Sequence, residues 1–268
     1  MSRHWGAQGK LAIVTTLAAV IASAAGCSTD SATAPRLTAA PVGRGFPDYA
    51  TFQQALVAAR NEANGGFNLD MWGTLLDRSG TVVAVAYTGA REGDQWQGSR
   101  VISAQKANTA NAFSLPGLAL STANLYSATQ PGGTLFGLQE SNPVDPSVAY
   151  GGKVSDYGTP KDYMVGKKIG GINVFGGGLP LYAPDGTLLG GLGVSGDASC
   201  ADHNIAWKVR HRLGLDYVPA GVADGGADDN IIYDITNGVS ASGFGHPECS
   251  AAATIIGDSL PIKYPISH

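Results

Sequence analysis

The residues best suited to chemistry in this sequence are two cysteines and two histidines that lie far apart in the chain at matching spacings. His203 follows Cys200 by three positions, and His246 precedes Cys249 by three. Two cysteines in an oxidising compartment are most simply paired, and a disulfide holds its Cα atoms about 5.5–6 Å apart. A Cys200–Cys249 bridge would therefore bring both imidazoles into one neighbourhood, where they could bind a divalent metal ion or the iron of a cofactor.

Two simpler interpretations of these residues remain open. Cys200 stands at the predicted start of a helix, where a thiolate is favoured, so it could be a reactive free thiol. Alternatively, the two histidines could be surface residues beside a purely structural bridge. Such a bridge would fasten the C-terminal tail to the helix that follows Cys200, and in the chain-entropy model it would stabilise the fold by about 4 kcal/mol.

A second pattern with chemical meaning is the G-x-G-x-x-G of Gly191, Gly193 and Gly196, which is the spacing of a dinucleotide-binding turn. Such a turn follows a complete strand, whereas only three residues separate the preceding turn from Gly190. Asp216 stands where a ribose-binding acid would be, but in a short segment that a proline ends. We therefore expect the glycines to lie inside a strand, where the backbone of a helix or of a partner chain approaches closely.

Other catalytic motifs are absent from the sequence. Residues 193–197 miss the nucleophile-elbow pattern because position 197 is aspartate, and there is no zinc-protease motif, P-loop or covalent haem-attachment motif. Charged residues make up 14% of the chain, against about 25% in typical proteins, and the formal net charge is −4. Nucleic acid is not an expected partner, because binding phosphates requires clustered Lys and Arg.

The surrounding sequence predicts the helices and strands that must position these residues. Apolar spacing and stop signals predict helices at 48–64, 99–112, 201–213 and, shorter, 120–127, and hairpins whose strands span 71–76 with 82–87 and 179–182 with 187–195. Each hairpin is followed by a helix, an order that favours an antiparallel sheet flanked by helices over alternating parallel units. The predicted fold class is α+β.

The helix predicted at 201–213 carries two stripes at the i, i+4, i+8 spacing. The core stripe is Ile205, Val209 and Leu213, and the second stripe, about 200° around the helix, is His203, Trp207 and His211. The second stripe faces away from the predicted core, so it would meet solvent, a partner subunit or a ligand. An exposed apolar stripe needs cover, which predicts a homo-oligomer; the alternative is contact of His203 and Trp207 with a ligand.

Several short motifs resemble one known family. They are Gly177-Gly178-Leu179-Pro180-Leu181, Asp185-Gly186, Gly191-Leu192-Gly193-Val194-Ser195-Gly196 and, upstream, Ser103-Ala104-Gln105-Lys106-Ala107. Together they resemble the haem-binding GlcG/HbpS-like family, which is related to the C-terminal domains of PduO-type proteins. The resemblance covers residues 52–213 and is interrupted by an insertion at about 142–168. It implies a profilin-like fold, homo-oligomers and, in some members, non-covalent binding of haem (haem b) or iron.

Lys106 is the residue of these motifs that could contact an anionic ligand, because its ammonium group is a positively charged hydrogen-bond donor. A lysine on a helix surface is more often simply solvated. The candidate cofactor-binding residues are therefore His203, His246, Lys106 and Trp207, with the two histidines as candidate metal ligands. No catalytic residue is assigned.

The N-terminus has the pattern of an exported lipoprotein. Within residues 1–26, Arg3 and Lys10 precede an uncharged, mostly apolar segment at 11–25, which has the length of a signal-peptide core and is shorter than a membrane-spanning helix. Small residues lead to Cys27, the predicted lipidation site, although alanine stands where a leucine is usual. Cleavage without lipidation and an uncleaved anchor are the alternatives.

The rest of the chain divides into three predicted parts. Residues 27–45, rich in Ser, Thr, Ala and Pro, form a flexible tether; residues 46–213 form the GlcG/HbpS-like domain; and residues 214–268 form a C-terminal tail packed on it. The sequence thus predicts a haem- or iron-binding protein of the cell envelope, either secreted or held at the membrane by its lipid. The alternatives are an enzyme acting on a small organic molecule in the same cleft, or a structural envelope protein.

Overall fold

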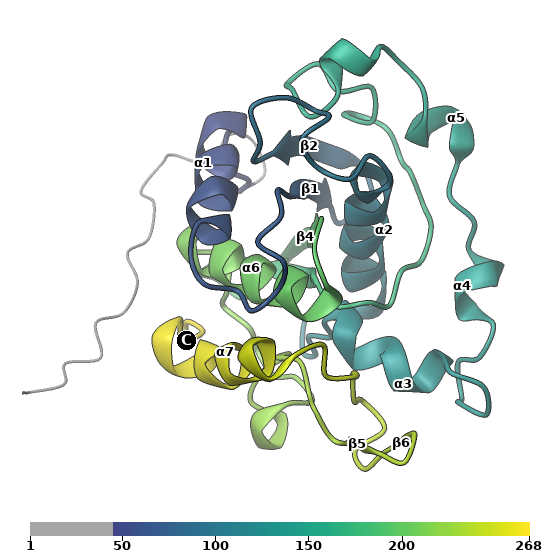
Figure 1. Ribbon diagram of the computed structural model, residues 1–268, viewed down its shortest axis with the longest axis vertical. Helices are drawn as coiled ribbons and strands as arrows, with labels where there is room; N and C mark the ends of the chain where they lie inside the picture. Colours follow the sequence, from purple (N-terminus) through teal and green to yellow (C-terminus); the bar gives the residue numbers. More distant parts are fainter. Residues whose placement is uncertain (1–44) are drawn as a thin grey trace, which may run out of the picture. The chain divides into compact units, whose positions relative to one another are not determined.

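The computed structural model describes residues 45–268 (Figure 1). The predicted signal peptide at 1–26, the lipidation site Cys27 and the tether up to residue 44 lie outside the described residues. Within residues 45–268, no helix is both long enough and apolar enough to cross a membrane.

Four antiparallel strands form the central sheet. They are β1 (Trp72–Asp77), β2 (Val82–Tyr87), β3 (Gly178–Tyr182) and β4 (Leu188–Ser195). The strand order is β2-β1-β4-β3, so the two hairpins join through β1 and β4, with Trp72 opposite Ser195. The two predicted hairpins are therefore confirmed, and so is the α+β fold class.

An aspartate fixes the turn of each hairpin. The carboxylate of Asp77 accepts hydrogen bonds from the backbone N–H groups of Ser79 and Thr81, both at 2.9 Å, and that of Asp185 accepts one from Thr187 at 3.0 Å. Both turns contain a glycine with positive φ, a conformation that L side chains rarely adopt. These are the Asp and Gly signals by which the sequence predicts the hairpins.

Three long helices cover the two faces of the sheet (Figure 1). They are α1 (Tyr49–Arg60), α2 (Gly98–Phe113) and α6 (Ser199–Arg212). α2 packs on one face, while α1 and α6 pack against each other on the opposite face. All three were predicted from apolar spacing, and α1 ends four residues earlier than predicted.

The glycines of β4 let the backbone of α2 pack directly against the backbone of the strand. A Cβ atom added at Gly193 would overlap the carbonyl oxygen of Ser103, and one at Gly191 would overlap that of Ala107. The hydroxyl groups of Thr74 and Ser103 also bond across this contact at 2.8 Å. Gly191 and Gly193 lie within the strand and carry close packing, as expected, whereas Gly196 directly follows the last residue of β4. They do not form a dinucleotide-binding turn.

The segment between the hairpins contains short helices. These are a 3-10 helix η1 (Thr122–Leu125), α3 (Tyr126–Thr129), α4 (Leu138–Ser141), α5 (Pro146–Ala149) and a 3-10 helix η2 (Val154–Asp156). The predicted insertion at 142–168 is fastened to α2 by Arg100, which forms an ion pair with Asp162 at 2.5 Å. Both side chains are buried, so the insertion is part of the packed structure.

The C-terminal tail covers the outer side of α6. It contains a 3-10 helix η3 (Asp224–Gly226), the small β5–β6 hairpin (Ile235–Thr236 and Val239–Ser240) and α7 (Ala251–Lys263). α7 packs against α6 (Figure 1) and was not predicted, because Gly257 and Pro261 interrupt its helical pattern.

The expectation that the second stripe of α6 is exposed is wrong. His203, Trp207 and His211 are all at most 1% exposed, because the tail supplies their cover. The indole N–H of Trp207 donates to the carbonyl oxygen of Tyr264 at 2.9 Å. The stripe therefore provides no reason for subunit association, and the homo-oligomer stays a prediction that rests on the family resemblance.

Candidate functional site

A cleft of about 290 Å³ opens where the end of β4 meets the start of α6 and one side of α2. Its lining consists of Trp96, Ser99, Ile102, Lys106, Phe175, Ser195, Asp197, Ser199 and Asp202. We refer to it as the cleft. It combines exposed aromatic rings at its rim with a buried pair of opposite charges, a combination suited to holding an apolar ligand in a fixed orientation.

Three consecutive glycines carry the loop that borders the cleft between α2 and α6. A Cβ at Gly177, where φ is +116°, would lie 2.9 Å from the Cβ of Asp202 and 3.2 Å from Nζ of Lys106. A Cβ at Gly178 would lie 2.5 Å from the backbone oxygen of Lys106. The motif Gly176-Gly177-Gly178 thus leaves room for the lysine and the aspartate to meet.

Lys106 and Asp202 form a buried ion pair in the cleft. Nζ of Lys106 lies 2.7 Å from Oδ2 of Asp202 and 3.2 Å from the carbonyl oxygen of Val194, and each side chain is 2% exposed. Burial raises the pKa of the Asp202 carboxyl to about 6, against the opposing effect of the lysine. The interpretation of Lys106 as a solvated surface lysine is wrong, while its contact with a ligand stays a prediction.

Two aromatic side chains at the rim of the cleft were not identified from the sequence. Trp96 is 58% exposed and Phe175 is 47% exposed, although the backbone of each is fixed. The carbonyl oxygen of Trp96 accepts from the indole of Trp72 at 3.0 Å, and that of Phe175 accepts from the hydroxyl of Thr122 at 2.5 Å. Both lie in loops without periodicity, so only their aromatic character could have drawn attention to them.

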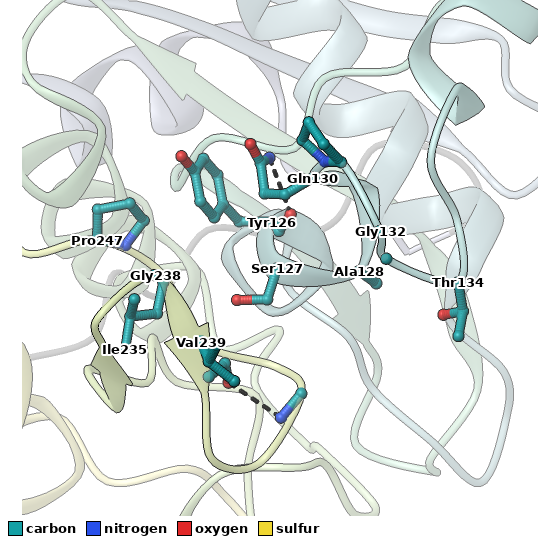
Figure 2. Close-up of a pocket in the computed structure, with 14 residues that line it drawn as sticks. Tyr126, Ser127, Ala128, Gln130, Gly132, Thr134, Ile235, Gly238, Val239 and Pro247 are labelled. Carbon is teal, nitrogen blue, oxygen red and sulfur yellow. Dashed lines mark hydrogen bonds between the residues drawn. The ribbon is translucent and has the colours of Figure 1, made fainter.

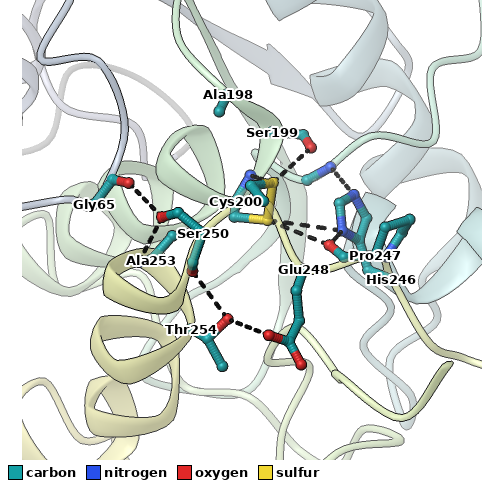
Figure 3. Close-up of a disulfide and its surroundings, with 12 residues drawn as sticks. Gly65, Ala198, Ser199, Cys200, His246, Pro247, Glu248, Ser250, Ala253 and Thr254 are labelled. Carbon is teal, nitrogen blue, oxygen red and sulfur yellow. Dashed lines mark hydrogen bonds between the residues drawn. A yellow bond between two sulfur atoms is a disulfide. The ribbon is translucent and has the colours of Figure 1, made fainter. Parts of the chain in front are cut away.

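Cys200 and Cys249 are joined by a disulfide, with their Cα atoms 5.9 Å apart (Figure 3). Cys200 is completely buried at the start of α6, whereas Cys249 is exposed. The backbone N–H of Cys200 also lies 3.2 Å from Sγ of Cys249. The bridge fastens the tail to the same helix end that contributes Ser199 and Asp202 to the cleft.

His203 is completely buried and is held by the tail. Its Nε2 lies 3.1 Å from Oδ1 of Asn230 and 3.1 Å from the backbone nitrogen of Ile231. Its Nδ1 has no hydrogen-bond partner among the described residues. Burial lowers the pKa of the imidazole to about 3, so the ring is neutral near pH 7.

His246 is also buried, with both ring nitrogens engaged. Its Nδ1 donates to the carbonyl oxygen of Pro247 at 2.8 Å, which leaves Nε2 to accept from the backbone N–H of Gly176 at 3.3 Å (Figure 3). Burial lowers its pKa to about 4. The alternative that these histidines lie on the surface is therefore wrong.

His203 and His246 both lie next to Gly176. A Cβ at Gly176 would lie 3.1 Å from the Cβ of His203, and the N–H of Gly176 binds His246. Across residues 45–268, no group of three or more His, Cys, Asp or Glu side chains could hold a metal ion. The two-histidine metal site stays a prediction. Of the four ring nitrogens of these histidines, Nδ1 of His203 is the one without a partner among residues 45–268.

A larger groove of about 730 Å³ lies between residues 126–134 and the β5–β6 hairpin (Figure 2). Tyr126, Gln130, Val239 and Pro247 are among the side chains around it, and none of the residues that line it is charged. One wall of this groove belongs to the tail, whereas every residue that lines the cleft lies between positions 96 and 202.

Comparison with known proteins gives one match that bears on function. A family model described as "Haem degrading protein HbpS-like" matches residues 48–210, which include every residue that lines the cleft. No curated protein matches the chain.

Two solved structures are similar to this chain at low identity. A PduOC:heme complex is 22% identical, with a TM-score of 0.43, over 65% of this chain and 95% of that chain. The Klebsiella pneumoniae protein ORFY, of the family DUF336, is 20% identical, with a TM-score of 0.41, over 68% of this chain and 97% of that chain.

Proposed function

Because the chain belongs to the HbpS-like family, whose description is "Haem degrading protein HbpS-like", we propose that it binds haem non-covalently and that the cleft is the binding site. The observation that carries this proposal is the position of the cleft. It is built entirely from the segment that matches the family, whereas the larger groove requires the tail, which lies outside the match.

The lining of the cleft fits the ring of a porphyrin better than it fits the iron. Trp96 and Phe175 offer exposed aromatic faces, and Ile102 adds apolar surface, all suited to a flat macrocycle. The lining contains no His, Cys, Met or Tyr, the residues that usually bind haem iron. His203, whose Nδ1 has no partner among the described residues, is not part of this lining. The proposed binding therefore relies mainly on ring contacts.

Within this proposal each group has a distinct task. The aromatic side chains hold the ring and exclude water from its faces. Lys106 lies beside Asp202 and can direct a further N–H toward a carboxylate of the ligand, because an ammonium group has three donors and two acceptors are already assigned. Haem, when bound, would supply an iron centre with redox chemistry.

Titration of the purified domain with hemin tests the proposal. Trp96→Ala and Phe175→Ala should each weaken binding by about five- to tenfold, since a good aromatic contact contributes about 1 kcal/mol. The measurement is the saturating shift of the Soret band. Phe136→Ala is the matched control, because Phe136 is 66% exposed and does not line the cleft. Equal losses in the Trp96, Phe175 and Phe136 variants would argue against the cleft. A fourth variant, Tyr126→Ala, changes a residue that lines the larger groove, and an effect confined to it would favour haem binding in the groove.

A second candidate function is catalysis on a small organic molecule in the same cleft. The observation that favours it is Asp202, whose raised pKa of about 6 suits a group that exchanges protons near neutral pH. In this case hemin would leave the spectrum without a saturating shift. The Asp202–Lys106 pair would then be the place to search for turnover.

We also propose that the protein is exported and anchored through lipid on Cys27. The support is the 11–25 apolar segment followed by small residues and a cysteine. Cys27→Ala should move the protein from the membrane fraction to the soluble fraction, because a lipid chain contributes about 0.8 kcal/mol of membrane affinity for each buried CH₂ group. Fractionation followed by immunoblotting measures this, and an unchanged distribution would refute the anchor.

A further inference from the structure

We propose that the Cys200–Cys249 bridge is a thiol–disulfide exchange site for dithiols, and that its reduction loosens the wall of the cleft through His246 and Gly176. The second part rests on the proposed function, because it concerns the ligand affinity of the same cleft. The first part is independent of any ligand.

The two sulfurs differ in access. Cys249 is exposed and Cys200 is completely buried, so an attacking thiolate meets Cys249. One thiolate of the dithiol forms a mixed disulfide with Cys249, and the S–S bond breaks with its electron pair on Cys200, which takes a proton. The second thiol of the reagent then closes its own disulfide and releases Cys249. Two electrons pass from the dithiol to the bridge, and both cysteines end as thiols.

The neighbourhood of Cys249 favours this release. The backbone N–H of Cys200 lies 3.2 Å from its Sγ, and the hydroxyl of Ser199 lies 3.5 Å from the same sulfur. Both groups stand at the start of α6, a helix of 14 residues. A departing thiolate at this position is stabilised by donors and by the positive end of the helix dipole.

The bridge connects directly to the cleft through one short segment. Only two residues separate Cys249 from His246, whose Nε2 accepts the N–H of Gly176 at 3.3 Å. Gly176 adjoins Phe175, one of the two exposed aromatic residues at the rim. The imidazole also lies beside the ring of Tyr126, with centroids 5.2 Å apart and planes tilted by 54°, and the ring of Tyr126 lies 6.2 Å from that of Phe175. A hydrogen bond and a chain of rings thus both lead from the bridge to Phe175.

Other contacts keep the rest of the tail in place when the bridge opens. Asp229 binds Arg210 through two short bonds, and Trp207 donates to Tyr264. Neither contact involves residues 246–250. Reduction should therefore release the segment 246–250 while the fold persists. The loop that carries Phe175 then has more conformational freedom, and the cleft binds a ligand less tightly because binding must order this loop.

Hydrogen exchange tests the local release without any ligand. The oxidised protein, and protein reduced with dithiothreitol and then alkylated, are compared by mass spectrometry. Exchange should rise in peptides covering 173–178 and 242–250 and stay unchanged in β4. Mass analysis of alkylated protein at several dithiothreitol concentrations should give a reduction rate proportional to dithiol. A bridge that is reduced only in denaturant, or unchanged exchange at 173–178, would overturn the proposal.

Hemin titration then tests the consequence for the cleft. Reduced, alkylated protein should bind hemin at least about fivefold more weakly than oxidised protein, and Cys249→Ser should match it and no longer respond to dithiothreitol. His246→Ala with the bridge intact should show the same weakening, and circular dichroism checks that each form is folded. Equal affinity in oxidised and reduced protein would overturn the coupling. Absence of hemin binding in every form would instead refute the proposed function, with the exchange data still deciding the redox site.

Discussion

Replacing Asp229 with asparagine should lower the free energy of unfolding by about 3–5 kcal/mol, because it leaves a buried guanidinium without its counter-charge. The two carboxylate oxygens of Asp229 accept from Arg210 at 2.7 and 2.8 Å, and both side chains are at most 1% exposed. The pair joins the tail to α6. Urea unfolding followed by circular dichroism measures the loss.

Two further variants show whether the effect comes from the unpaired charge. Glu140→Gln removes an exposed acid on α4 and should change stability by less than about 0.5 kcal/mol. The double variant Arg210→Met/Asp229→Leu should recover most of the stability, since it removes both charges and keeps similar volume. A loss below about 1 kcal/mol in Asp229→Asn would mean that Arg210 finds another partner.

Acidification from pH 6 to pH 4 should also destabilise the protein strongly. Burial lowers the pKa of His203 to about 3 and that of His246 to about 4. Between pH 6.5 and about 4 the unfolded chain therefore binds one more proton at each histidine than the folded chain does. The free energy of unfolding falls as pH falls through this window, by up to about 1.4 kcal/mol per pH unit for each histidine.

Asp202 acts in the opposite direction. Its carboxyl has a pKa of about 6 in the folded chain, above the ordinary value of 3.8, so acidification from pH 6 to pH 4 favours the folded state at this group. The two histidines lower the free energy of unfolding on acidification and the aspartate raises it, so these three groups together lower it by about 1.4 kcal/mol for each pH unit. Urea unfolding at pH 4, 5, 6 and 7 measures the slope. His203→Gln and His246→Gln should each flatten it, and a double variant with the slope of the wild-type protein would contradict the assignment.

Local signals in the sequence were sufficient for the sheet and its three long helices. The Asp side chains of the two turns bind backbone groups no more than four positions away, so both hairpins can be identified from short stretches of sequence. The same holds for the glycines of β4, whose place inside a strand indicated close packing before the partner, α2, was known. Cys200 and Cys249 could be paired because a single pair remained after Cys27.

Long-range contacts could not be predicted in the same way. The tail buries His203 and Trp207 through residues that follow them by more than 20 positions, and nothing in the helix itself indicates that cover. Lys106 looked like a surface residue because its partner, Asp202, is 96 residues away. Trp96 and Phe175 lie in irregular loops, where spacing provides no information about which side chains share a cleft.

The contacts between the C-terminal tail and the end of α1 also set the order of events during synthesis. Glu62 bonds to the hydroxyl of Tyr264, and the carbonyl oxygen of Gly65 accepts from Ser250 at 2.8 Å, across 185 residues. Because synthesis proceeds from the N-terminus, the residues at the end of the first helix acquire these partners only after Ser250 and Tyr264 have been made.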